Sequence, residues 1–106
     1  MTPGRVASVR FLPAASAEVE AAFLWYEEQR VGLGSEFLAA INDAVSHVVA
    51  WPEASPSVRQ VDGIPVRRVP VSRFPYVLFY YRRQKLLRVV AVAHTRRRPR
   101  YWASRL

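Results

Sequence analysis

The segment YVLFYYRRQKLLRVVAVAH, residues 76–94, decides the fold of this chain. Two dense apolar runs, YVLFYY (76–81) and LLRVVAVA (86–93), flank the polar tetrapeptide RRQK (82–85). Aromatic and β-branched residues suit the pleated surface of a strand, and a short polar segment between two such runs is typical of a hairpin. Because both runs are almost continuously apolar, we expect them in the middle of a sheet covered on at least one face.

Further strands are predicted on both sides of the helical region that precedes this hairpin. VASVRFLP (6–13) alternates apolar and polar residues and stops at Pro13, which predicts a short N-terminal strand. VRQV (58–61) and IPVRRVPV (64–71) are short strand candidates, and their prolines suit the edge of a sheet better than its centre.

Two helices are predicted between these strands, in AASAEVEAAFLWYEEQR (14–30) and EFLAAINDAVSHVVAW (36–51). In both, apolar residues recur at intervals of three and four, which places them on one face of a helix. Ser16 is the expected N-cap of the first helix. Gly32 and Gly34 interrupt the pattern, and a connection this short predicts an antiparallel helical hairpin.

The expected order is therefore β-αα-β-β-β, an α+β class protein that forms a single domain over residues 1–106. The helical hairpin packs on a mostly antiparallel sheet, with a three-strand meander after the helices. Trp25 and Trp51 are expected to pack the hairpin against that sheet.

Charge divides the chain into two unequal halves. Residues 1–53 hold three basic and seven acidic side chains, a net charge of −4, whereas residues 54–106 hold thirteen basic and one acidic, a net charge of +12. The second half presents a strongly positive field whose natural partners are RNA, DNA or an acidic protein segment. We expect its guanidinium groups to form one continuous docking face on the sheet and its end.

Several classes of protein are not expected. The chain has no cysteine and only two histidines, far apart in sequence, so neither a metal site nor a cofactor is predicted. No targeting segment is recognised in the N-terminal residues, and no apolar run approaches the length needed to span a bilayer. A cytoplasmic protein is the expectation.

The segment AHTRRRPRYW (93–102) places four arginines and two aromatic residues directly after the last predicted strand. It can be read as a solvated chain end, as a nucleic-acid clamp or as the edge of an active site. Aromatic residues among arginines suit stacking on bases or docking into a protein pocket, so partner binding is favoured over an idle tail. Trp102 can equally pin the chain onto the sheet, and His94 can satisfy a backbone group rather than catalyse.

Three segments together resemble the RelE/ParE superfamily of type II toxins. They are WYEEQRVGLGSEFLAAI (25–41), RRVPVSRFPYVLFYY (67–81) and VVAVAHTRRRPRYW (89–102), which occur in the family's order. The resemblance implies a RelE-like fold, a helical hairpin beside a small antiparallel sheet. It also implies a growth-inhibiting toxin neutralised by an acidic, partly disordered antitoxin.

The superfamily has two branches with different targets. Its RelE branch cleaves mRNA in the ribosomal A site, and its ParE branch inhibits DNA gyrase. In the ribonuclease branch, cations typically follow the aromatic residue of the third strand and the end of the last strand. Here those positions hold Val77, after Tyr76, and Thr95, after His94, which favours a ParE-like toxin that acts by binding.

Two alternatives remain open. The first is a ribosome-dependent, metal-independent endoribonuclease using Arg68, Arg73, His94 and Tyr101, and the second is a non-toxic basic nucleic-acid-binding module. The residues expected to bind the target or the antitoxin are Arg67, Arg68, Arg73, Arg96, Arg97, Arg98, Arg100, Tyr101 and Trp102.

Overall fold

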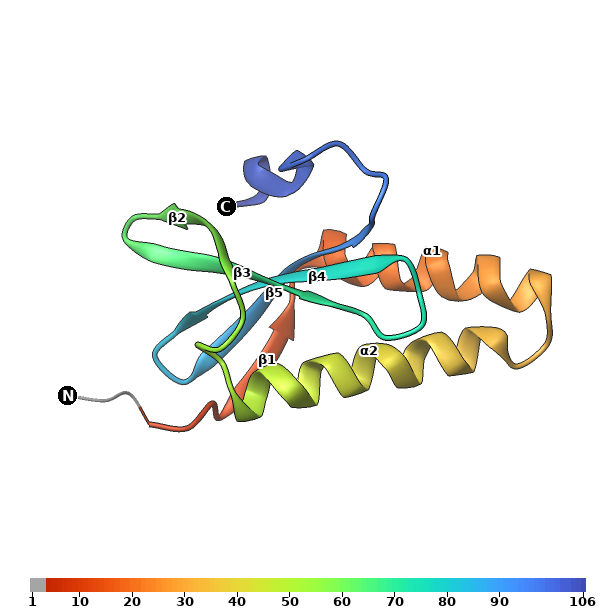
Figure 1. Cartoon of the computed structure of the whole chain (residues 1–106), viewed down its shortest axis with the longest axis horizontal. Helices are drawn as coiled ribbons and strands as arrows, with labels where there is room; N and C mark the ends of the chain where they lie inside the picture. The colour runs from red at the N-terminus through yellow and green to blue at the C-terminus, as the bar shows by residue number, and fades with distance from the viewer. Residues whose placement is uncertain (1–3) are drawn as a thin grey trace.

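A computed structural model describes residues 4–106, in which a helical hairpin and a C-terminal segment lie on opposite sides of one sheet (Figure 1). The sheet has the strand order β1-β5-β4-β3-β2, with β1 parallel to β5 and the other neighbours antiparallel. The predicted α+β class is confirmed. The elements are β1 (Ser8–Phe11), α1 (Pro13–Gln29), α2 (Leu33–Ala50), β2 (Ser57–Val61), β3 (Ile64–Pro70), β4 (Tyr76–Arg83), β5 (Leu86–His94) and the 3₁₀ helix η1 (Tyr101–Arg105).

Four strands follow the helices, one more than the predicted meander. The additional strand arises because Asp62 and Gly63 both adopt positive φ angles, 51° and 78°, and join β2 to β3 in a two-residue hairpin. An Asp-Gly pair favours this turn because its backbone twist matches that of the flanking strands. β3 consequently lies between β2 and β4 rather than at an edge, and its prolines, Pro65 and Pro70, lie near its two ends.

Two separate hydrophobic clusters cover the two faces of the sheet. The larger one joins the buried stripes of α1 and α2 to residues such as Leu78, Tyr80 and Val89, whose side chains are fully buried. The smaller one contains Val66, Val90, Ala91 and Trp102, and it holds the C-terminal segment on the opposite face. The sheet is therefore covered on both sides, which agrees with the near-continuous apolar runs of β4 and β5.

A β-bulge in β5 supplies two adjacent residues to the smaller cluster. Tyr80 pairs with Val89, but Phe79 pairs with Ala91, so Val90 has no opposite residue on β4. Such an insertion breaks the alternation of side chains and bends the strand. Val90 and Ala91, although adjacent, both lie in the smaller cluster.

The helices differ from prediction at two points. α1 begins at Pro13 with Leu12 as N-cap, so Ser16 is not the cap; proline suits the first turn because its fixed φ is already helical. Trp25 and Trp51 are 55% and 64% exposed and do not pack the hairpin on the sheet. Tyr26, adjacent to Trp25, takes the buried position on α1, and neighbouring helical residues point about 100° apart.

The turn between the helices depends on both glycines. Gly32 adopts a φ of 92°, a conformation that favours glycine, and Glu27 Oε1 accepts hydrogen bonds from the N–H groups of Gly32 and Gly34, both at 2.9 Å. A Cβ atom on Gly34 would lie 2.7 Å from the Phe23 carbonyl oxygen. The close approach of α1 and α2 therefore requires a glycine at position 34.

No helix within residues 4–106 has the length and apolarity needed to cross a membrane.

Candidate functional site

The C-terminal segment leaves β5 at His94 and returns across the face of the sheet that the helices leave open (Figure 1). Trp102 anchors it: the side chain is 1% exposed, and its ring centroid lies 5.0 Å from that of Phe79. Trp102 therefore holds the segment in place, and its side chain offers almost no surface to a partner.

A group of charged and polar contacts, which we call the Glu18 clasp, fixes the segment to α1 and β5. Glu18 Oε2 accepts hydrogen bonds from the Tyr101 hydroxyl at 2.5 Å and from Arg105 at 3.0 Å. Glu18 Oε1 accepts from the Val92 N–H at 3.0 Å and from Arg105 at 2.9 Å. Arg105 also donates to the carbonyl oxygen of Val90, the bulge residue, at 3.1 Å. The clasp thus joins two backbone groups of β5 to other elements: the Val92 N–H to Glu18 of α1, and the Val90 carbonyl to Arg105 near the end of the chain.

The contacts of the clasp shift the pKa values of Glu18 and Tyr101. Burial alone would raise the pKa of the Glu18 carboxyl, but hydrogen bonds from Arg105, Tyr101 and Val92 outweigh it, and the pKa lies below its usual value. Burial, and the hydrogen bond that Tyr101 donates to the charged Glu18, raise the pKa of the Tyr101 hydroxyl well above its usual value. Tyr101 therefore stays protonated, and its hydroxyl is committed to Glu18.

Beside the clasp lies a hollow of about 180 Å³, which we call the arginine cleft. Its lining includes exposed arginines from β3 and from the loop after β5, together with buried apolar side chains from β4, β5 and η1. Because the arginines are exposed and most of the apolar residues are buried, the cleft has a cationic rim and an apolar floor. The rim consists of Arg68, Arg97, Arg98 and Arg100, and the floor of Val77, Phe79, Ala93 and Trp102.

The chain's similarity to known proteins agrees with this architecture. Residues 9–99 match a family described as ParE toxin of type II toxin-antitoxin system, parDE. The chain belongs to the ParE toxin family. The predicted resemblance to the RelE/ParE superfamily is confirmed, on its ParE side.

One solved structure, titled "Chromosomal ParDE TA system from P. aeruginosa", has a similar fold. The alignment has a TM-score of 0.60 and 18% identity, and it covers 86% of this chain and 98% of that chain. No curated protein sequence matches the chain.

In this ParE-family chain, the predicted site residues do not form one continuous face. Arg67 and Arg68 are neighbours in β3 and point to opposite faces of the sheet; Arg67 donates to the Ser55 carbonyl oxygen at 2.8 Å. Arg73 lies in the turn between β3 and β4 and forms an ion pair with Glu36 of α2 at 2.9 Å. The expectation of a single docking face is therefore wrong for Arg67 and Arg73.

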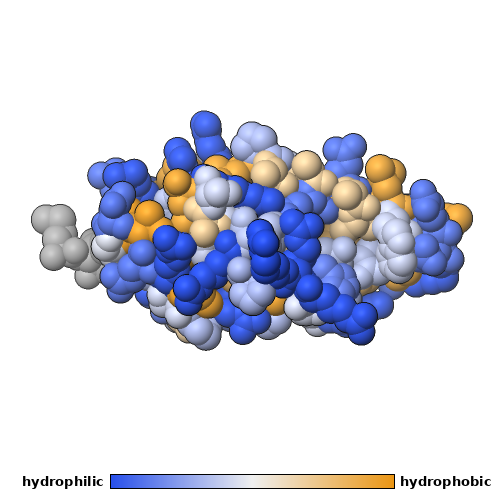
Figure 2. Space-filling view, turned by 90° about the horizontal axis from the view of Figure 1, so that it is seen from above, coloured by the Kyte–Doolittle hydropathy of each residue, from blue (hydrophilic) through white to orange (hydrophobic). Residues whose placement is uncertain are grey.

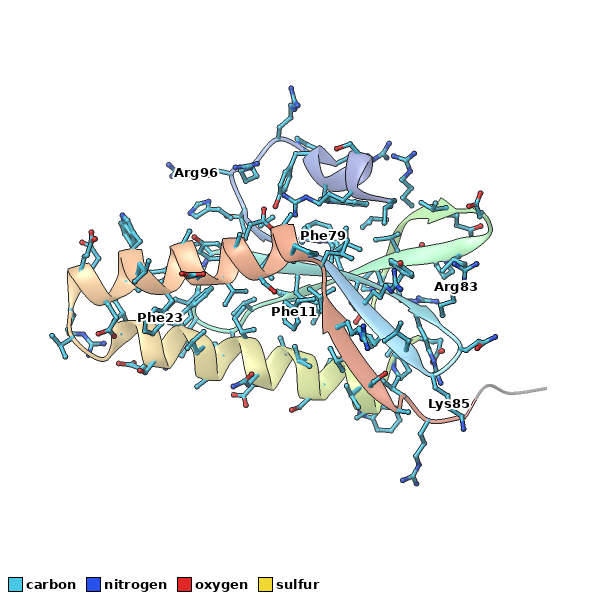
Figure 3. The ribbon with its side chains drawn as sticks, turned by 180° about the vertical axis from the view of Figure 1, so that it is seen from behind. Phe11, Phe23, Phe79, Arg83, Lys85 and Arg96 are labelled. Atoms are coloured by element: carbon cyan, nitrogen blue, oxygen red, sulfur yellow. The ribbon has the colours of Figure 1, made fainter. Side chains whose placement is uncertain are left out.

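The loop after β5 also divides its arginines. Arg97, Arg98 and Arg100 line the arginine cleft. Arg96 is exposed and lies on the outer side of the loop, away from the sheet (Figure 3). The Arg97 guanidinium stacks over the Tyr101 ring, 4.1 Å from its centroid, so Tyr101 holds one rim arginine in place.

Only three of the four residues named for an endoribonuclease lie at the same cleft. Arg68, His94 and Tyr101 line the arginine cleft, but Arg73 does not. His94 Nδ1 accepts the backbone N–H of Arg96 at 3.1 Å, which orders the start of the loop. Val77, at the position where the resemblance to the ribonuclease branch leads one to expect a cation, is 5% exposed and forms part of the floor. Within residues 4–106, no cluster of three or more His, Asp or Glu side chains is arranged to hold a metal ion.

Glu18 and Arg105 were not among the residues predicted from the sequence. One signal for Glu18 was available, because it lies three residues after Ala15 and four before Ala22, both on the buried stripe of α1. A carboxylate at such a position needs a cation or several hydrogen-bond donors. Nothing in the local sequence indicates that Arg105, 87 residues later, supplies them.

Proposed function

We propose that this ParE-family toxin arrests growth by binding DNA gyrase, without chemistry of its own. The observation that carries the proposal is that polar groups around the arginine cleft already form hydrogen bonds within the chain. The Tyr101 hydroxyl donates to Glu18, His94 Nδ1 accepts from the loop backbone, and Val77 occupies the position at which the ribonuclease branch typically has a cation. General acid–base catalysis needs groups that are free to exchange protons, and binding does not.

We further propose an acidic antitoxin as the partner that silences the toxin. The +12 charge of residues 54–106 favours a negatively charged protein, and a segment that folds on binding can cover a large surface. The proposed arrangement is one domain acting in the cytoplasm, with the rim arginines available to the target or the antitoxin.

DNA supercoiling by purified gyrase tests the proposal. The folded toxin is expected to inhibit supercoiling and to leave mRNA on programmed ribosomes uncut. Because a basic protein can also inhibit by coating DNA, the control is a peptide of residues 93–106, which carries five of the arginines. Equal inhibition by this peptide would refute a specific action on gyrase.

The second candidate is a ribosome-dependent endoribonuclease, favoured by the presence of Arg68, His94 and Tyr101 at one cleft. It predicts cleavage of ribosome-bound mRNA that the His94→Ala variant slows. Cleavage that persists unchanged in His94→Ala would show that His94 takes no part in it.

A further inference from the structure

Within residues 4–106, the four rim arginines have no acidic partner, whereas four other arginines of the chain do. Arg30, Arg73, Arg82 and Arg105 each form an ion pair with a glutamate. Within residues 4–106, no carboxylate oxygen lies within 4.0 Å of a rim arginine's guanidinium nitrogens. The cleft therefore concentrates four positive charges that the described part of the chain does not neutralise.

Local structure holds these charges together although they repel one another. The backbone of Arg100 has a positive φ of 59°, unusual for a residue with a side chain, and turns the chain back toward the sheet. The ring of Tyr101 supports Arg97, and the Glu18 clasp fixes Tyr101. A strained backbone residue beside a group of like charges is typical of a ligand site.

The floor of the cleft indicates what kind of anion fits. Phe79, which is partly buried, and the edges of Val77 and Ala93 form an apolar surface directly beneath the rim. Figure 2, which looks onto this side of the molecule, shows hydrophilic side chains across its middle with apolar ones beside them. Guanidinium groups beside an aromatic and apolar surface match the alternating phosphates and ring faces of a nucleic-acid strand.

The size of the cleft supports the same conclusion. A volume of about 180 Å³ is below the range of about 300–1,000 Å³ that encloses a whole small molecule. It suits one phosphate group with its sugar, the rest of the strand continuing over the exposed arginines. An acidic peptide would use the rim but would leave the apolar floor without a matching group.

We propose that the arginine cleft binds the phosphodiester backbone of single-stranded nucleic acid, with one nucleoside against the apolar floor. DNA and RNA share this chemistry. The proposal goes beyond gyrase binding and does not depend on it, because the cleft would bind a strand whatever protein the toxin targets.

Fluorescence anisotropy with labelled single-stranded DNA and RNA of one sequence tests the proposal on the whole purified protein. If each rim arginine neutralises one phosphate, affinity falls by about 50-fold between about 50 and 200 mM salt. Arg68→Ala combined with Arg98→Ala leaves two contacts and reduces this loss to about 7-fold, with weaker binding at low salt. Stronger binding of RNA would identify a contact to the 2′-hydroxyl, and equal binding a contact to the backbone alone.

The matched control is Arg96→Ala, which removes the same charge from the same loop but outside the cleft. This variant is expected to bind like the unmodified protein. Equal weakening by Arg96→Ala and by a single rim variant such as Arg98→Ala would overturn the proposal, because net charge would then explain binding. A polyglutamate peptide with the same number of charges that binds as tightly as the strand would also overturn it, in favour of an acidic protein ligand.

Photocross-linking tests the proposal without any variant, in case the double variant does not fold. A strand carrying a photoreactive thymine analogue is expected to cross-link to residues of the cleft, such as Phe79 or His94, and cross-links only elsewhere would contradict the proposal. Supercoiling inhibition without strand binding would refute this inference and leave the proposed function intact. If the protein binds the nucleic-acid strand but leaves gyrase active, this inference stands and the proposed function is refuted.

Discussion

The Glu18→Gln substitution tests the structural role of the clasp. Glutamine keeps the size of the side chain but removes its charge, and it leaves the Arg105 guanidinium, 20% exposed, without its carboxylate. Removing one member of a buried ion pair costs about 3–5 kcal/mol. Because Glu18 and Arg105 are 19% and 20% exposed, solvent screens part of this effect, and we expect a loss of about 2–3 kcal/mol.

Urea denaturation, followed by tryptophan fluorescence, measures this loss, because urea does not screen charges as guanidinium chloride does. The corresponding decrease in Tm is about 8–12 °C for a chain of this length. The control is Glu20→Gln, which removes a charge two residues away at an exposed position of α1. A substitution at an ordinary surface site changes the free energy of unfolding by about 0.5 kcal/mol or less. If Glu18→Gln changes it by no more than this, the account of the clasp is refuted.

The same substitution has a defined pH dependence. The pKa of Glu18 is lowered in the folded protein from a usual value of 4.5, so the clasp contributes its full stability above pH 4.5. That contribution is lost as the pH falls through the lower pKa of the folded state. The stability difference between the unmodified protein and Glu18→Gln is therefore expected to be constant near neutral pH and to shrink below pH 4.5. A difference that grows on acidification would contradict the sign of the pKa shift.

Three further substitutions test the packing. Trp102→Ala removes the anchor of the C-terminal segment and is expected to destabilise the protein by about 3–5 kcal/mol in urea denaturation; a loss below 1 kcal/mol would mean that the segment is not docked. Gly34→Ala places a Cβ 2.7 Å from the Phe23 carbonyl oxygen and is expected to cost about 1–3 kcal/mol by calorimetry, whereas an unchanged Tm would show that the helices can separate at no cost. Trp25→Ala changes a side chain that is 55% exposed, and its effect on thermal stability is expected to stay within about 0.5 kcal/mol; a larger loss would place Trp25 in the core.

Most of the fold was predictable because it rests on local periodicity. The dense apolar runs in residues 76–94 and the spacing of three and four in the two helical segments each depend on neighbours in the sequence. The strand count was wrong because the Asp62–Gly63 turn, also a local signal, was not recognised as a hairpin. The opposite orientation of Arg67 and Arg68 likewise follows from the period of a strand, and it explains why one docking face was not found.

The candidate site was less predictable because its decisive contacts are distant in the sequence. Glu18 and Arg105 meet only after the sheet has formed and the chain has returned across it. The bulge at Val90 depends on the register between β4 and β5, which no local pattern specifies. The arginine run was correctly recognised as a charged group, but only the structure separates the three arginines of the cleft from Arg96.

Titration of purified gyrase with this protein, with ribosome-bound mRNA assayed in parallel, tests most directly whether the toxin acts by binding rather than by cleavage. The account predicts that supercoiling stops once toxin and gyrase are present in comparable amounts, while the mRNA stays full length. Active gyrase together with cut mRNA would contradict it.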